Sequence, residues 1–411
     1  MPRIQTVRAR EILDSRGTPT VEVDVVLDGG ALGRASVPSG ASRGSHEAHE
    51  LRDGAERFSG KGVTGAVEVV HGEIRVALCG GQYGQYELDE TLRSLDGTAN
   101  KERLGGNTVL AVSLAFAKAC AENEQLPLFR YLQRLTETEL SLPRGMFNII
   151  NGGVHADSGI SFQEFMVIPQ LSDSWQECLR AASEIYHTLK HELHVAGFAT
   201  SVGDEGGFAP RLANNREALS LIERSVTQAG YTPGEDVLLA LDVAANELAS
   251  TGGYTVDGEL LKATDLIAYY RALASEYPVA MIEDPFSEDD TGSFEQLVRE
   301  RIPGLSVVGD DLFVTNAVRL RNGSEHRRAQ AIIIKPNQVG TLTETLETVK
   351  VARENGITPI ISHRSGETED VFIAHLAVAS GAPYIKSGAP ARGERTAKYN
   401  ELLRIEEALK H

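Results

Sequence analysis

Six short apolar runs between residues 237 and 386 each end on a polar or charged residue. The end residues are Asp242, Glu283, Asp310, Lys335, His363 and Lys386. They follow one another at intervals of 23 to 41 residues, about the length of one strand, one helix and two short loops. Continuous apolar strands separated by helical segments indicate a parallel sheet that is covered on both faces.

The closed form of such a sheet is a (β/α)8 barrel of about 250 residues, and residues 143–411 supply that length. An open doubly wound sheet is the competing architecture, and periodicity alone does not separate the two. That sheet would more often carry a glycine-rich phosphate loop after its first strand, and the chain contains neither G-x-G-x-x-G nor G-x-x-x-x-G-K-[ST]. The barrel is therefore preferred, with its catalytic groups expected at the strand ends.

Residues 1–135 have a different pattern, which predicts a smaller α+β domain. Residues 20–26 alternate apolar and polar side chains, as expected of a half-buried strand. Residues 109–119 combine good helix formers with a nearly continuous apolar face. Between them, residues 37–45 form a loop of small residues with two glycines, which is either a passive connection or a mobile lid.

The formal net charge of −18 restricts the partners of this chain. So negative a surface repels nucleic acids and anionic membranes, and no apolar run approaches the roughly 18 residues of a membrane helix. The three cysteines, Cys79, Cys120 and Cys178, form neither a zinc pattern nor a disulfide framework. With no signal-like stretch at the N-terminus, we expect a cytoplasmic protein. An anionic substrate would need cations concentrated at one place.

Three successive strand ends, Asp242, Glu283 and Asp310, are carboxylates. Each alone is best explained as a solvated loop acid. If the strands are neighbours in a barrel, however, the three carboxylates repel one another unless a cation lies between them. An all-oxygen set of this kind suits Mg²⁺.

The next strand ends on Lys335, which would face the same site. A nearby dication would lower its pKa and make it a general base; the alternative is a salt-bridge partner for the acids. Upstream, Glu205 lies in a glycine-rich turn and Glu164 on the strand-like residues 162–168. Each could be structural, but together with Lys335 they could supply an acid on one face of a substrate and a base on the other.

The last strand ends gather cationic and hydrogen-bonding groups. His363, Arg364 and Ser365 precede Gly366, and this set suits a phosphate, although an ordinary polar loop explains it equally well. Lys386 adds a compact positive charge suited to a carboxylate. The order of charges along the strands therefore favours a small anionic substrate, carrying phosphate and carboxylate, that bridges a metal and a Lys/Arg cluster.

Long motifs along essentially the whole chain are similar to those of the enolase family, the 2-phospho-D-glycerate hydro-lyases of glycolysis. They occupy residues 10–17, 37–42, 147–155, 163–166, 202–210, 362–370 and 398–406. So many matches in order are far more specific than one short motif. The resemblance implies a TIM-like barrel with an N-terminal capping domain, two Mg²⁺ per active site and a homodimer or higher oligomer, with Arg16 in a segment associated with the subunit interface.

The resemblance also implies individual roles. Asp242, Glu283 and Asp310 would hold the first Mg²⁺, and Ser42 would help to hold the second. Lys335 would take the C2 proton, and Glu205, supported by Glu164, would protonate the leaving hydroxyl. The remaining expected site residues are His155, Gln163, His363, Arg364, Ser365 and Lys386.

The chain departs from the family pattern at Arg43, where enolases usually have Thr, and Pro336 follows the position of the catalytic lysine. Arg43 is either a solvated substitution or an extra contact to an anionic group that 2-phosphoglycerate lacks. Three hypotheses follow. The chain is an enolase; or a paralogue that dehydrates a related phosphorus acid, for example to carboxyphosphonoenolpyruvate; or a binding protein that kept the fold without the chemistry.

Overall fold

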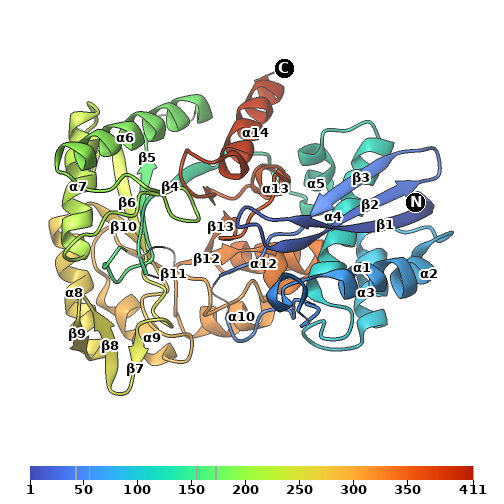
Figure 1. The fold of residues 1–411 in the computed structure, drawn as a ribbon, viewed down its shortest axis with the longest axis horizontal. Coiled ribbons are helices and arrows are strands. Elements are labelled where there is room, and N and C mark those ends of the chain that lie inside the picture. Colours follow the sequence, from blue (N-terminus) through green and yellow to red (C-terminus); the bar gives the residue numbers. More distant parts are fainter. Residues whose placement is uncertain (42–43, 55, 154–155, 157, 172–173, 411) are drawn as a thin grey trace.

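The computed structural model describes residues 1–411 except 42–43, 55, 154–155, 157, 172–173 and 411. An antiparallel sheet and a set of helices form the N-terminal part (Figure 1). Its strands are β1 (Ile4–Leu13), β2 (Pro19–Leu27) and β3 (Leu32–Ser36). Its helices are α1 (Thr64–Val69), α2 (Arg75–Leu78), α3 (Gln85–Asp96), α4 (Gly106–Asn123) and α5 (Leu128–Thr136), with η1 (Arg57–Gly60) and η2 (Val70–Ile74) as shorter turns.

Helix α4 packs on β2 and β3, and nearly all of its side chains are buried. A Cβ at Gly33 in β3 would lie 1.9 Å from the carbonyl oxygen of Ala115, so only glycine permits this close approach of strand and helix. The expected strand and helix are confirmed. The expected half-exposure of residues 20–26 is wrong, because both faces of β2 are covered.

Eight strands close into a barrel in the order β10-β11-β12-β13-β14-β4-β5-β6. Their bounds are β4 (Arg144–Asn151), β5 (Glu164–Pro169), β6 (Val237–Asp242), β10 (Val279–Glu283), β11 (Ser306–Gly309), β12 (Ala331–Ile334), β13 (Thr358–Ser362) and β14 (Tyr384–Lys386). The small strands β7 (Ala249–Ser250), β8 (Gly253–Val256) and β9 (Glu259–Leu261) form a separate sheet.

Helices surround the barrel (Figure 1). They are α6 (Trp175–Val195), α7 (Asn215–Gln228), α8 (Ala263–Glu276), α9 (Thr291–Glu300), α10 (Ala317–Glu325), α11 (Pro336–Val339), α12 (Leu342–Glu354), α13 (Phe372–Ala379) and α14 (Gly393–Lys410). None of the described helices combines the length and apolar character that a membrane span requires.

The expectation of an all-parallel barrel is wrong at one strand, since β5 runs antiparallel to both β4 and β6. Among the described residues, no α-helix lies between β4 and β5, whereas α6 and α7 both lie between β5 and β6. The reversal brings the first residue of β5, Glu164, opposite Asp242, the last residue of β6. A strand start therefore joins the strand ends at the same mouth of the barrel.

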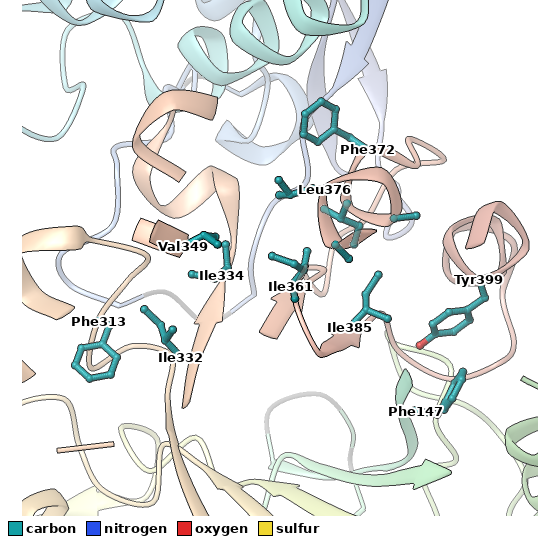
Figure 2. Close-up of a cluster of buried hydrophobic side chains, with 14 of the residues drawn as sticks. Phe147, Phe313, Ile332, Ile334, Val349, Ile361, Phe372, Leu376, Ile385 and Tyr399 are labelled. Atoms are coloured by element: carbon teal, nitrogen blue, oxygen red, sulfur yellow. The ribbon is translucent and has the colours of Figure 1, made fainter. Parts of the chain in front are cut away.

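The barrel wall buries apolar side chains on both faces. Met146, Met166, Met281, Ile333 and Ile360 belong to the cluster inside. Outside, Ile332, Ile334, Ile361 and Ile385 meet Val349 of α12 and Phe372 and Leu376 of α13 (Figure 2). This two-sided burial explains why the strands read as unbroken apolar runs.

The N-terminal part is held to the barrel by partly buried ion pairs. Lys118 of α4 contacts Asp370 at 2.6 and 2.7 Å, and Lys101 contacts Glu344 at 2.7 Å. The segment after β3 continues to the barrel mouth, where Ser39 pairs with Gly366. Residues of both parts therefore surround one site.

Candidate active site

The predicted strand-end side chains meet in one pocket at the barrel mouth. The lining residues are Gly40, Gln163, Glu164, Glu205, Asp242, Ala244, Asp284, Asp310, Asp311, Lys335, Ser362, His363, Arg364, Ser365 and Lys386. Among these described residues, six carboxyl groups face three cationic side chains. Such a concentration of unbalanced buried acids is unusual in a folded protein and marks a functional site.

Lys386 lies at the centre of the acidic part. Its Nζ is 2.7 Å from Glu283, 3.0 Å from Asp242 and 3.1 Å from Glu164, and all four side chains are almost completely buried. Burial alone would lower the pKa of Lys386, but the surrounding carboxylates outweigh it and raise that pKa well above its usual value. One ammonium group therefore forms ion pairs with three carboxyl groups.

The donor set around Lys386 fits a divalent cation. Glu283 Oε1 is buried without a hydrogen-bond partner among the described residues. Burial, reinforced by the Asp242 carboxylate, raises the pKa of Glu283 well above its usual range. A hard cation would pair with such an oxygen and remove the repulsion between the acids, and carboxylate oxygens are the ligands that Mg²⁺ prefers.

Asp310 and Lys335 form a separate ion pair beside this cluster. Asp310 Oδ1 also accepts a hydrogen bond from Gln338 Nε2 at 2.8 Å, so the carboxylate is held at both oxygens. Burial would lower the pKa of Lys335, but the Asp310 carboxylate outweighs it and raises that pKa. Lys335 is thus held as an ammonium while Asp310 is its direct partner.

Two further acids that sequence reasoning missed belong to the mouth. Asp284, Asp310 and Asp311 place carboxylate oxygens within 4.8 Å of one another, a grouping that includes only Asp310 of the predicted metal set. Asp284 accepts hydrogen bonds from the backbone N–H groups of Asp310 and Asp311 at 2.9 and 2.7 Å, so its carboxylate fixes the loop after β11. The signal was present in the doublets 283–284 and 310–311.

Glu205 is far from Lys335 in the sequence but lines the same pocket. Its Oε2 accepts a hydrogen bond from Asn148 Nδ2 at 2.9 Å. His363 Nε2 lies 3.5 Å from the same oxygen, which is too long for a strong hydrogen bond. Burial lowers the pKa of His363 to about 3, so this imidazole is neutral at physiological pH.

The expected phosphate-binding residues contact the segment that follows β3. Arg364 contacts Glu47 through two bonds of 2.9 and 3.1 Å, and both side chains are buried. Ser365 Oγ accepts a hydrogen bond from the Ala41 N–H at 2.6 Å. Arg16, expected near a subunit interface, donates to the Ser39 carbonyl at 3.0 Å and lies 3.5 Å from Ser365 Oγ.

The structure brings together the predicted residues Gln163, Glu164, Glu205, Asp242, Asp310, Lys335, His363, Arg364, Ser365 and Lys386 as pocket-lining groups. Glu283 joins them through Lys386. The remaining three predictions, Ser42, Arg43 and His155, lie outside the described residues.

Comparison with protein-family models gives two matches that together cover nearly the whole chain. The model described as "Enolase, N-terminal domain" matches residues 4–132. The model described as "Enolase, C-terminal TIM barrel domain" matches residues 139–411, which include every barrel strand.

Proposed function

The chain belongs to the enolase family, and on that premise we propose that it is a Mg²⁺-dependent hydro-lyase that converts 2-phospho-D-glycerate to phosphoenolpyruvate and water. The observation that carries the proposal is the surplus of buried carboxylates at the barrel mouth, in a pocket that Lys335 and Arg364 also line. This combination supports an anionic substrate held between a metal and a cationic subsite.

In this proposal Asp242, Glu283 and Asp310 would hold one Mg²⁺, and Ser42 would help to hold a second. Bound there, the ions would supply positive charge to the substrate carboxylate and so make the C2 proton more acidic. When Asp310 is engaged by the cation, Lys335 would lose its carboxylate partner and could release its proton. Its neutral Nζ would then take the proton from C2. The electron pair of that C–H bond then forms the new double bond as the C3–O bond breaks.

Glu205 is the acid of the second half of the reaction. It donates a proton to the departing C3 hydroxyl, which leaves as water. Asn148 fixes the Glu205 carboxyl through its 2.9 Å hydrogen bond. Burial, reinforced by the neighbouring carboxyl group of Glu205, raises the pKa of Glu164. The two carboxyl groups would therefore share one proton, which Glu205 would pass to the leaving oxygen.

Other residues of the same pocket are assigned to the substrate anions. Arg364 and Ser365 are assigned to the phosphate, since a guanidinium fork and a hydroxyl suit its oxygens. Lys386 is assigned to the carboxylate, and Gln163 also lines the pocket. His155 is assigned to the same site from the family resemblance alone.

The direct test is turnover of 2-phospho-D-glycerate by the purified chain, followed as phosphoenolpyruvate formation with Mg²⁺ and again after chelation. The proposal predicts activity that disappears with the chelator and returns with Mg²⁺. Unchanged substrate in the presence of Mg²⁺ would reject it.

A second candidate is favoured by Arg43, which adds a cation where the family usually has Thr. It is dehydration of a 2-phosphoglycerate analogue to carboxyphosphonoenolpyruvate. Steady-state kinetics on both substrates separate the candidates. Arg43→Thr should shift the preference toward 2-phosphoglycerate, and an unchanged preference would remove the reason for this candidate.

A further inference from the structure

Arg395, in the first turn of α14, is fully buried behind the pocket. Its guanidinium donates to three backbone carbonyls: Arg364 at 2.6 Å, Ser365 at 2.5 Å and Asp204 at 3.0 Å. Its remaining terminal contact is His363 Nδ1 at 2.6 Å. The carbonyls belong to residues next to Glu205 and His363, so one side chain joins the two segments that carry these groups.

The direction of the bond to His363 follows from the chemistry of arginine. A guanidinium has five N–H donors and no acceptor, and it keeps its proton in proteins. His363 Nδ1 must therefore accept the hydrogen bond and carry no proton. Since burial lowers the pKa of His363 to about 3, the single imidazole proton lies on Nε2.

The Nε2–H group that results has no hydrogen-bond partner among the described residues. Its nearest acidic oxygen is Glu205 Oε2 at 3.5 Å, and both side chains line the pocket. Gly388 packs against the other edge of the ring: a Cβ there would lie 3.2 Å from His363 Cε1 and 3.0 Å from the Arg395 side chain. The ring is therefore held in place with its Nε2–H group beside Glu205 at the pocket.

We propose that Arg395 is a positioning residue that fixes His363 as the Nε2–H tautomer, so that this donor and Glu205 act together on the oxygen that leaves the substrate. The effect on kcat rests on the proposed function, whereas the tautomer of His363 does not depend on it. Arg395 touches neither substrate nor metal in this arrangement and acts through His363.

The first experiment needs no activity. Long-range ¹H–¹⁵N correlation spectra of the ¹⁵N-histidine-labelled, Mg²⁺-loaded protein report which ring nitrogen is protonated, and the His363→Gln spectrum assigns the signal. We expect a protonated Nε2 and an unprotonated Nδ1 at neutral pH. A protonated Nδ1, or an imidazolium, would overturn the proposal whether or not the chain is a dehydratase.

The second experiment is a double-mutant cycle with Arg395→Lys and His363→Gln. Arg395→Lys should lower kcat by about 10- to 100-fold while KM changes little, because the interaction affects the reacting oxygen more than binding. In the His363→Gln background the same change should cost almost nothing more. The matched control is Arg404→Lys on the exposed side of α14, which pairs with Glu401 and should leave kcat unchanged.

Two outcomes would show that Arg395 does not act through His363. Either the double variant loses kcat by the product of the two single losses, or Arg395→Lys keeps the wild-type kcat. If Arg395→Lys fails to fold, the spectrum of the wild-type protein decides the proposal. If the wild-type protein does not dehydrate 2-phosphoglycerate or its analogue, the proposed function fails, and the tautomer remains open to the same spectrum.

Discussion

Two groups of buried charges in this chain differ in balance, and the difference separates a structural cluster from a catalytic one. On the N-terminal sheet, two acids meet two arginines. Arg34 Nε lies 2.6 Å from Asp24, Arg10 Nη1 lies 2.5 Å from Glu22, and the arginines remain partly exposed. At the barrel mouth, Lys386 forms ion pairs with three almost fully buried carboxylates.

A balanced cluster needs nothing more to be stable, whereas an unbalanced one is costly until a ligand completes it. The sheet cluster lowers the pKa of its acid, as Asp24 shows, while the barrel cluster raises the pKa of Glu164 and Glu283. Carboxylates therefore stabilise the fold in the sheet cluster, whereas in the barrel cluster they favour the binding of a cation.

The largest expected effect is loss of turnover on removal of the base from the unbalanced cluster. Lys335→Ala should lower kcat by about 10²- to 10⁴-fold, since a positioned proton acceptor contributes that much. The matched control is Lys350→Ala, which removes an exposed amine from α12 and should leave kcat unchanged. Kinetics with circular dichroism of both variants check this.

The same pair of variants tests the third hypothesis, a binding protein without chemistry. Such a protein would show no turnover for either variant or for the wild-type chain. A folded Lys335→Ala protein that keeps wild-type turnover would instead remove Lys335 from the mechanism.

A smaller effect is expected on stability when Mg²⁺ is added. At a concentration of 100 times its Kd, a cation that binds only the folded chain adds about 2.7 kcal/mol. Thermal unfolding of the wild-type protein should therefore shift upward with Mg²⁺ and return after chelation. Glu283→Gln should abolish the shift, because it removes one carboxylate from the cluster.

The comparison also predicts how the metal-free variants differ. Glu283→Gln relieves repulsion in the barrel cluster and should be no less stable than the wild-type chain without Mg²⁺. Glu22→Gln breaks a balanced cluster and should be less stable, by about 1 kcal/mol, while keeping the full response to Mg²⁺. Equal responses of the two variants to Mg²⁺ would contradict the distinction.

The sequence predicted the barrel and its mouth well, for a physical reason. The barrel strands are buried on both faces and end at the pocket of the barrel mouth. An apolar run followed by a polar residue therefore marks both the strand and the site. An apolar run does not show whether its strand is parallel or antiparallel to its neighbours. The reversal of β5 was therefore missed. The assignment of Ser42 to a second Mg²⁺ and of His155 to the site came from motif resemblance, which periodicity could not supply.

Other contacts were beyond sequence reasoning because the folded chain brings distant residues together. Glu47 meets Arg364 across 317 positions of the sequence, and Arg395 meets His363 across 32. Neither pair has a local spacing that would predict it. Asp284 and Asp311 were adjacent to predicted ligands, so the doublets were visible, but only the loop geometry shows which acid holds the backbone and which faces the pocket.

The smallest expected effect concerns the balanced cluster and pH. Burial would raise the pKa of Asp24, but Arg34 and Arg10 outweigh it and lower the pKa from 3.8 to about 2. A lowered pKa in the folded state stabilises the fold above pH 3.8, and this contribution is lost as pH falls toward 2. It amounts to about 1 to 2 kcal/mol once the exposure of the arginines is taken into account.

Hydrogen exchange of the β1 and β2 amides measures this contribution locally, without requiring the whole chain to unfold as one unit. Asp24→Asn should exchange faster than the wild-type protein at pH 6, once rates are corrected for intrinsic exchange, and the difference in opening free energy should shrink below about pH 4. Asp28→Asn is the control, because its partner Arg3 is exposed and 3.7 Å away. A difference for Asp24→Asn that stays constant down to about pH 2 would show that the charge of Asp24 does not stabilise the sheet, and the contrast with the barrel mouth would then rest on the buried acids there alone.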